Sequence, residues 1–133
     1  MSSDIAIIGI GCLFPGARNA HAYWHNILAQ KNSLTEIPAD RWNWDSYYKP
    51  GQSTGDAICS KWGGFLEPVP FQPLEFGIPP NSLRYIEPLQ LLSLKAVQAA
   101  LQDSGYDSRP FPKEQTSVIL GILTTIPDLG QQY

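Results

Sequence analysis

Two histidines near the start of the chain have the spacing of a shared metal site. His21 and His25 stand four residues apart, so a helix would present both imidazoles on one face, where they could hold a single metal ion. The zinc-protease form of this pattern has Glu beside the first His, and here Ala22 occupies that position. No third ligand and no Cys-x-x-Cys pair accompanies them. We therefore interpret the two histidines as a solvated helix edge, and we predict no metal ligand in this sequence.

The two cysteines are the candidates for a nucleophile. An activated thiolate needs a helix N-terminus or a neighbouring histidine to lower its pKa. Cys12 follows an apolar run and precedes Leu-Phe-Pro, a setting typical of a small packed thiol, and Cys59 lies in a polar loop with no evident partner. We predict that neither is catalytic. Two cysteines in 133 residues also do not make a disulfide framework.

Gly9 and Gly11 follow an apolar run, as in a dinucleotide-binding turn. That fingerprint needs a third glycine three residues later, opening a helix that holds the pyrophosphate. Phe14 and Pro15 stand there instead, and no strand ending in an acidic residue follows at the required distance. The two glycines therefore indicate close packing of the backbone, and we predict no cofactor-binding residue.

An aromatic segment at residues 41–48 could stack on nucleic-acid bases or sugars. Its surroundings contain Asp40 and Asp45 rather than a basic stripe, and the formal net charge of the chain is −3. A protein that binds the phosphate backbone usually carries a basic excess. We therefore predict no nucleic-acid partner, and we interpret the rings as anchors that fasten an irregular loop to a core.

The elements that must position these residues begin with a strand and a helix. Residues 5–11 form a continuous Ile-rich run, which predicts a strand buried on both faces. Pro15 and Gly16 then turn the chain. Asn19 is a suitable N-cap for a helix over 20–30, whose large apolar residues share one face.

Regular structure is interrupted between residues 33 and 81. Repeated prolines exclude a long helix there, and most of the aromatic residues of the chain lie in the same segment. A structureless loop of this length is unusual inside a compact domain. We therefore predict an ordered, aromatic and Pro-rich excursion that contains a short strand near residues 61–66.

The last part of the chain contains the clearest helix. Pro88 suits the first helical position, the apolar pattern continues to Ser104, and Gly105 suits a C-terminal cap. A short helical piece over 83–86 precedes it. Since this helix is apolar on most sides, we expect it to be buried. Residues 116–123 predict a second buried strand, so the expected organisation is one α/β unit over 1–133, with a core of 4–32 and 82–124 around an excursion of 33–81.

The composition of the chain indicates its cellular location and the character of its surface. The sequence has no secretory signal after Met1 and no run of about 20 apolar residues that could span a membrane, so we expect a chain that starts at Met1 and resides in the cytoplasm. Only 16% of the residues are charged, against about 25% in typical domains. Such a surface is typical of one that another part of an assembly covers.

Together these segments resemble the N-terminal part of the β-ketoacyl synthase domains of type I polyketide and polyunsaturated-fatty-acid synthases. The match is collinear over nearly the whole chain, and one departure is Leu91, where the family's acid-Pro-Gln-Gln-Arg helix start has Arg. The segments that carry it are residues 5–16 (IAIIGIGCLFPG), 23–28 (YWHNIL), 37–42 (IPADRW), 62–66 (WGGFL), 76–81 (FGIPPN), 87–90 (EPLQ) and 118–121 (VILG).

The resemblance implies a thiolase-like α/β/α/β/α fold, of which this chain holds only the N-terminal portion, and a full domain that dimerises. It implies decarboxylative Claisen condensation of an acyl thioester with a malonyl-carrier extender, both carried on phosphopantetheine. The family's nucleophilic Cys, in a Thr-Ala-Cys-Ser-Ser turn, and its two catalytic His have no match in residues 1–133. We therefore transfer no catalytic residue. The implied partners are an acyl carrier protein, the remaining ketosynthase segment and other synthase subunits.

Two hypotheses of different class follow. The first is a truncated or split ketosynthase that is inactive alone. The alternative is a stand-alone, non-catalytic interaction module derived from such a domain, which binds a carrier protein or a synthase subunit. A nucleotide-binding oxidoreductase is a distant third, because the glycine pattern of residues 9–15 does not support it.

Overall fold

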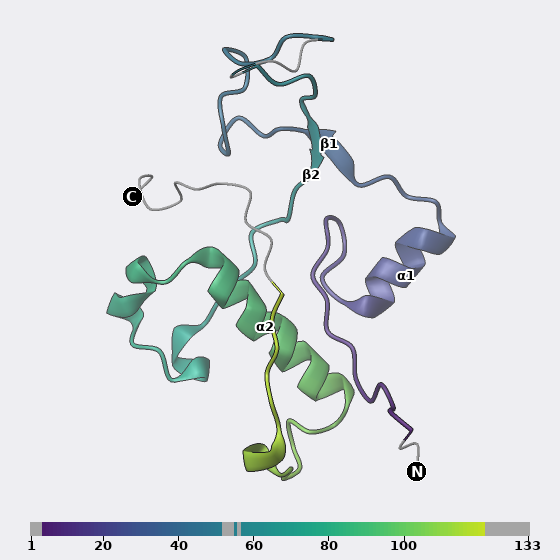
Figure 1. Cartoon of the computed structure of the whole chain (residues 1–133), viewed down its shortest axis with the longest axis vertical. Coiled ribbons are helices and arrows are strands. Elements are labelled where there is room, and N and C mark those ends of the chain that lie inside the picture. Colours follow the sequence, from purple (N-terminus) through teal and green to yellow (C-terminus); the bar gives the residue numbers. More distant parts are fainter. Residues whose placement is uncertain (1–3, 52–54, 56, 122–133) are drawn as a thin grey trace.

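The computed structural model describes residues 4–51, 55 and 57–121. Two helices dominate this part of the chain, and a small antiparallel hairpin stands apart from them (Figure 1). In chain order the elements are α1 (Ala20–Leu28), β1 (Leu34–Glu36), β2 (Trp62–Gly64), the 3-10 helices η1 (Pro73–Phe76) and η2 (Pro80–Tyr85), α2 (Pro88–Asp103) and η3 (Lys113–Gln115).

Helix α1 forms where the sequence predicts it. The side chain of Asn19 accepts a hydrogen bond of 2.8 Å from the Ala22 amide and so caps the helix. The helix ends at Leu28, two residues before the predicted end, because Gln30 adopts a left-handed backbone conformation with φ 53° that turns the chain. Tyr23 packs on the ring of Phe14, with centroids 4.3 Å apart.

The predicted helix α2 is also confirmed, and it ends at the predicted glycine cap. Gly105 has φ 71°, a conformation that glycine adopts without strain, and the Tyr106 amide then donates to the Leu101 carbonyl at 2.9 Å. The short helical piece expected at 83–86 is the end of η2. The expected burial of α2 is wrong, because none of its residues is fully buried. Most residues of its last three turns are half-buried, which means that part of the helix surface has no cover.

The two buried strands predicted at 5–11 and 116–123 are not strands in the described part of the chain. There the one sheet is the pair β1 and β2, which run antiparallel with Leu34 opposite Gly64. Residues 5–11 and 116–121 are extended but have no neighbouring strand, and residues 122–123 lie outside the described residues. A strand needs a partner for its backbone N–H and C=O groups, which an apolar sequence pattern cannot supply by itself.

Aromatic side chains also contact the segment between β1 and β2, which is the first part of the excursion expected at 33–81. Trp44 donates its Nε1 hydrogen to the Ile37 carbonyl at 3.2 Å, and the ammonium of Lys61 lies 4.9 Å from the centre of the Trp44 ring. Lys61 also pairs with Glu36 at 2.7 Å. The hydrogen bond and the charge of Glu36 raise the pKa of Lys61 above its usual value. These contacts hold the two ends of the segment between β1 and β2 beside the paired strands.

The fold leaves far more surface exposed than a complete domain does. Among the described residues, Ala17 is the one fully buried apolar side chain. The chain exposes 11,244 Å², whereas a compact monomer of 14.7 kDa exposes about 6,900 Å². The described part of the chain contains no helix that is both long and apolar enough to cross a membrane.

Candidate functional site

The first extended segment lies directly on the backbone of α2. A Cβ atom at Gly9 would lie 2.5 Å from the Ala100 carbonyl oxygen, and one at Gly11 would overlap the carbonyl oxygen of Ala96. Only glycine allows an approach this close. The interpretation of the Gly-x-Gly pair as a backbone-packing device is therefore confirmed.

A hydrogen bond fixes the direction of the same segment. The amide of Ile10 donates to the Oδ2 atom of Asp103 in the last turn of α2, at 2.8 Å. Since a charged acceptor makes a stronger bond than a neutral one, this contact holds the segment in register along the helix. The amide faces α2 at this point and is not free for a neighbouring strand.

The second extended segment lies along the C-terminal half of α2. Figure 1 shows the trace of residues 116–121 running beside this helix. Ile8 and Gly9 from the first segment, Val97 and Leu101 from α2, and residues 116–120 line one groove of about 700 Å³. Tyr106 and Phe111, packed edge to face with centroids 5.6 Å apart, belong to the lining of the same groove. We call this surface the strand groove.

The side chains of both extended segments are uncovered. Exposure reaches 97% at Ile5, 86% at Ile7 and 91% at Ile119. Continuous runs of large apolar side chains are typical of a strand enclosed between layers. The strand groove can therefore bind another polypeptide segment by burying apolar surface. Among its described lining residues we find no arrangement for acid–base or nucleophilic chemistry.

The residues considered for chemistry in the sequence are not brought into such a site. His21 and His25 are exposed on α1, Cys12 is a half-buried free thiol beside Gly11, and Cys59 is an exposed free thiol. Over residues 4–51, 55 and 57–121, no three His, Cys, Asp or Glu side chains gather as metal ligands. The prediction that the chain has no catalytic, cofactor-binding or metal residue stays a prediction.

Comparison with known families decides which fold this arrangement belongs to. The family described as "Beta-ketoacyl synthase, N-terminal domain" matches residues 2–131. The chain belongs to this family. The resemblance drawn from the sequence is thus confirmed, and the fold is the N-terminal portion of a thiolase-like ketosynthase fold.

The relatives of this ketosynthase chain are much longer proteins. It is 38% identical to polyketide synthase PksN of Bacillus subtilis over 118 residues, which are 88% of this chain and 2% of PksN. It is 40% identical to polyketide synthase ThaQ of Burkholderia thailandensis over 108 residues, which are 78% of this chain and 5% of ThaQ. The chain therefore spans only a few per cent of the length of these relatives.

Solved ketosynthases show the same fold. The ketosynthase from module 6 of the bacillaene synthase of Bacillus subtilis superposes with a TM-score of 0.66 and 35% identity, over 75% of this chain and 16% of that one. The oxazolomycin ketosynthase domain OzmH KS7 of Streptomyces albus gives a TM-score of 0.66 and 28% identity, over 73% and 17% of the two chains. The described fold therefore corresponds to a small share of a ketosynthase.

Sequence reasoning found the segments of the strand groove but not their exposure. Their apolar character predicts burial, and burial depends on what lies against them rather than on their own residues. The low charged fraction of 16% is the signal in the sequence that points to a surface in need of cover. The chain spans 16% of a solved ketosynthase, so most of that fold lies outside the matched part.

Proposed function

We propose that this chain is the N-terminal scaffold of a β-ketoacyl-[acyl-carrier-protein] synthase and that the rest of the ketosynthase covers its strand groove. The observation that carries the proposal is the pair of extended apolar segments, 5–11 and 116–121, which lie beside α2 and pair with no strand among the described residues. The chain exposes about 4,300 Å² more than a compact monomer of its mass. This excess is several times the area of about 800 Å² that a standard interface buries on each partner, so it fits a chain that a large further part of the domain covers.

The reaction of the assembled enzyme is decarboxylative Claisen condensation. A cysteine thiolate takes the acyl group from a phosphopantetheine thioester and releases the carrier thiol. The malonyl extender loses CO₂, and its enolate attacks the acyl carbon, which forms the new C–C bond and frees the thiolate. The Cys and the two His of this chemistry belong to the remaining segment, and this chain supplies no catalytic residue.

The partners follow from this assignment of the scaffold to one chain and the catalytic residues to another segment. The remaining ketosynthase segment is the obligate partner, acyl carrier protein delivers both substrates on phosphopantetheine, and the complete domain dimerises in the cytoplasm beside other synthase subunits. The relatives of the chain support this, since they are polyketide synthases. The non-catalytic interaction module is not favoured, because its isolated chain would need a buried core, and Ala17 is the one fully buried apolar side chain among the described residues.

A complementation experiment tests the proposal. The chain is co-expressed with the part of the bacillaene module 6 ketosynthase that follows its matched region, and loading of a radiolabelled acyl thioester is measured. We expect a stable complex that loads the acyl group, and no loading by the chain alone. The variant Ile8→Asp, which places a charge in the strand groove, should abolish the complex, while Lys49→Glu should not. Acylation of the pure chain, or a complex that Ile8→Asp leaves intact, would contradict the proposal.

A further inference from the structure

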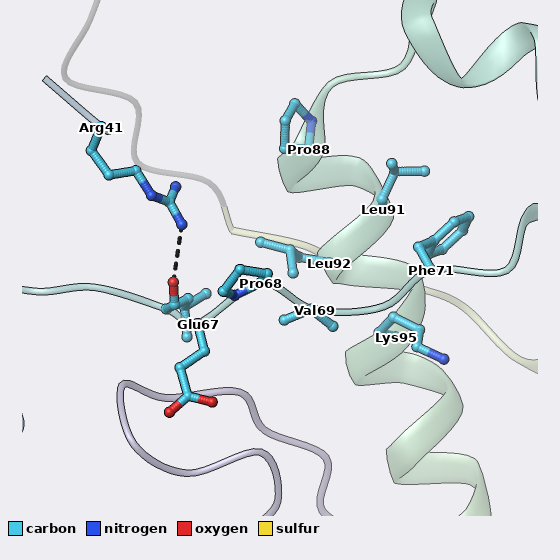
Figure 2. A pocket seen from close by; sticks show the side chains of 10 residues that line it. Arg41, Glu67, Pro68, Val69, Phe71, Pro88, Leu91, Leu92 and Lys95 are labelled. Carbon is cyan, nitrogen blue, oxygen red and sulfur yellow. Dashed lines mark hydrogen bonds between the residues drawn. The ribbon is translucent and has the colours of Figure 1, made fainter. Parts of the chain in front are cut away.

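A second groove lies on the other side of α2. Val69 and Phe71 from the segment before η1, together with Leu91 and Leu92 from α2, line a hollow of about 220 Å³. Figure 2 shows these side chains facing one another, with Arg41 on one side of the hollow and Lys95 on the other. We call it the Arg41–Lys95 groove.

The two grooves use opposite faces of the same helix. Residues 88, 91, 92 and 95 line the Arg41–Lys95 groove, and residues 97, 100, 101 and 104 line the strand groove. At about 100° per residue, the mean directions of the two sets differ by about 180°. A chain that covers the strand groove therefore packs against the other face of α2, so this second groove needs its own explanation.

Its size selects the class of occupant. Sites for small molecules and cofactors have volumes of about 300–1,000 Å³, and this hollow has about 220 Å³. Its floor is formed by aliphatic and aromatic side chains that are half-buried, so they retain apolar surface to bury. These properties fit one large apolar side chain of a docked peptide segment better than a free metabolite.

The charges at the groove indicate which side chains should flank the apolar side chain of the docked segment. The guanidinium of Arg41 donates one hydrogen bond, to the Leu66 carbonyl at 3.0 Å, and among the described residues its side chain makes no other. Lys95 contacts neutral groups, the amide oxygen of Gln98 at 3.1 Å and the ring of Phe76 at 5.5 Å. Both cations therefore retain donors for a carboxylate.

The one acidic side chain in the lining does not cancel these charges. Glu67 pairs with Arg18 at 2.9 Å, so its charge is already balanced by a neighbour. The groove is thus locally positive in a chain whose net charge is −3. Such a patch attracts negatively charged segments.

We infer that the Arg41–Lys95 groove docks an acidic peptide segment of a partner protein. A large apolar side chain of that segment, Leu or Phe, fills the hollow between Val69, Phe71 and α2. Carboxylates on either side of it pair with Arg41 and Lys95. This contact uses the face of α2 opposite to the strand groove, so it can be tested separately from the proposed function.

Fluorescence anisotropy of the full chain, alone and in complex with the complementing ketosynthase segment, tests the inference. The probe is the peptide Glu-Glu-Leu-Phe-Glu-Glu with a neutral label. We expect saturable binding with a Kd below about 1 mM that weakens with added salt. Replacing Leu and Phe of the peptide by Ser should weaken it at least about tenfold, and replacing its Glu by Lys should abolish it.

Protein variants separate docking from a general charge effect. Lys95→Glu should weaken binding about tenfold, and Lys95→Arg, which retains the charge, should restore it. The matched control Lys49→Glu makes the same change of net charge away from the groove and should leave binding unchanged. Absence of saturable binding in both forms of the chain, equal binding of the Lys peptide, or equal losses in Lys95→Glu and Lys49→Glu would overturn the inference. Failure of the complex to form, with peptide binding retained by the chain, would count against the proposed function only.

Discussion

Replacing Gly11 by Ala should separate the first extended segment from α2. The added Cβ would overlap the Ala96 carbonyl oxygen and lie 2.6 Å from the Ala100 amide nitrogen. An α-helix joins these two groups by its own i to i+4 hydrogen bond. Neither can move aside without breaking the helix, so the segment itself must shift away.

The expected cost follows from two opposing effects. Overpacking a close contact costs about 1–3 kcal/mol, and rigid backbone on both sides places this site in the upper half of that range. Gly→Ala also restricts the unfolded chain and returns about 0.4–1 kcal/mol. We therefore expect the free energy of unfolding to fall by about 1–2.5 kcal/mol. Gly121→Ala is the matched control, because a Cβ there meets none of the described residues within 4 Å, and it should be neutral or slightly stabilising.

Two measurements on the complex with the complementing segment check this prediction. Urea unfolding gives the free-energy difference between the two alanine variants, expected at about 1–3.5 kcal/mol. Hydrogen exchange reports the amide of Ile10, which should lose protection in Gly11→Ala and keep it in Gly121→Ala. If Gly11→Ala unfolds within about 0.5 kcal/mol of the parent chain and Ile10 stays protected, the close packing on α2 is refuted.

Three further predictions concern single contacts. Asn19→Ala removes the cap of α1 and should cost about 1 kcal/mol, measured by urea unfolding, with loss of helix signal at the earliest stage of unfolding. Asp103→Ala removes the acceptor of the Ile10 amide and should cost about 1 kcal/mol and speed exchange of that amide; unchanged exchange would exclude the bond. The raised pKa of Lys61 predicts that its ion pair with Glu36 stabilises the fold below the ordinary lysine pKa, and that this contribution is lost as pH rises through the folded value. A ¹³C titration of the lysine side chains should show Lys61 titrating above the others, and Glu36→Gln should bring it back toward them.

Local signals predicted the helices well. Asn19, Pro88 and Gly105 act through hydrogen bonds and backbone angles within a few residues, so their roles can be worked out from the sequence. The packing of Gly9 and Gly11 was predictable for the same kind of reason, since glycine pairs in apolar runs permit close approach. The end of α1 was less predictable, because glutamine has no preference for the left-handed backbone conformation that Gln30 adopts.

The features that were not predictable depend on distant chain. Whether residues 5–11 form a strand depends on neighbours that no local pattern contains. Strand β1 is fixed by pairing with β2, which a long intervening segment separates from it in the sequence. The Arg41–Lys95 groove combines three segments far apart in the sequence, so neither its shape nor its charge could be inferred from any one of them.

The exposed first segment has a consequence for biosynthesis. A ribosome adds about 5–20 residues per second, so residues 5–11 emerge long before residues 116–121. During that interval an Ile-rich run with open backbone groups can pair with the same run on a neighbouring nascent chain. The early contact of Gly9 and Gly11 with α2, together with the Ile10–Asp103 bond, occupies one side of the run as soon as the helix forms. On a polysome, this contact would reduce aggregation between neighbouring nascent chains.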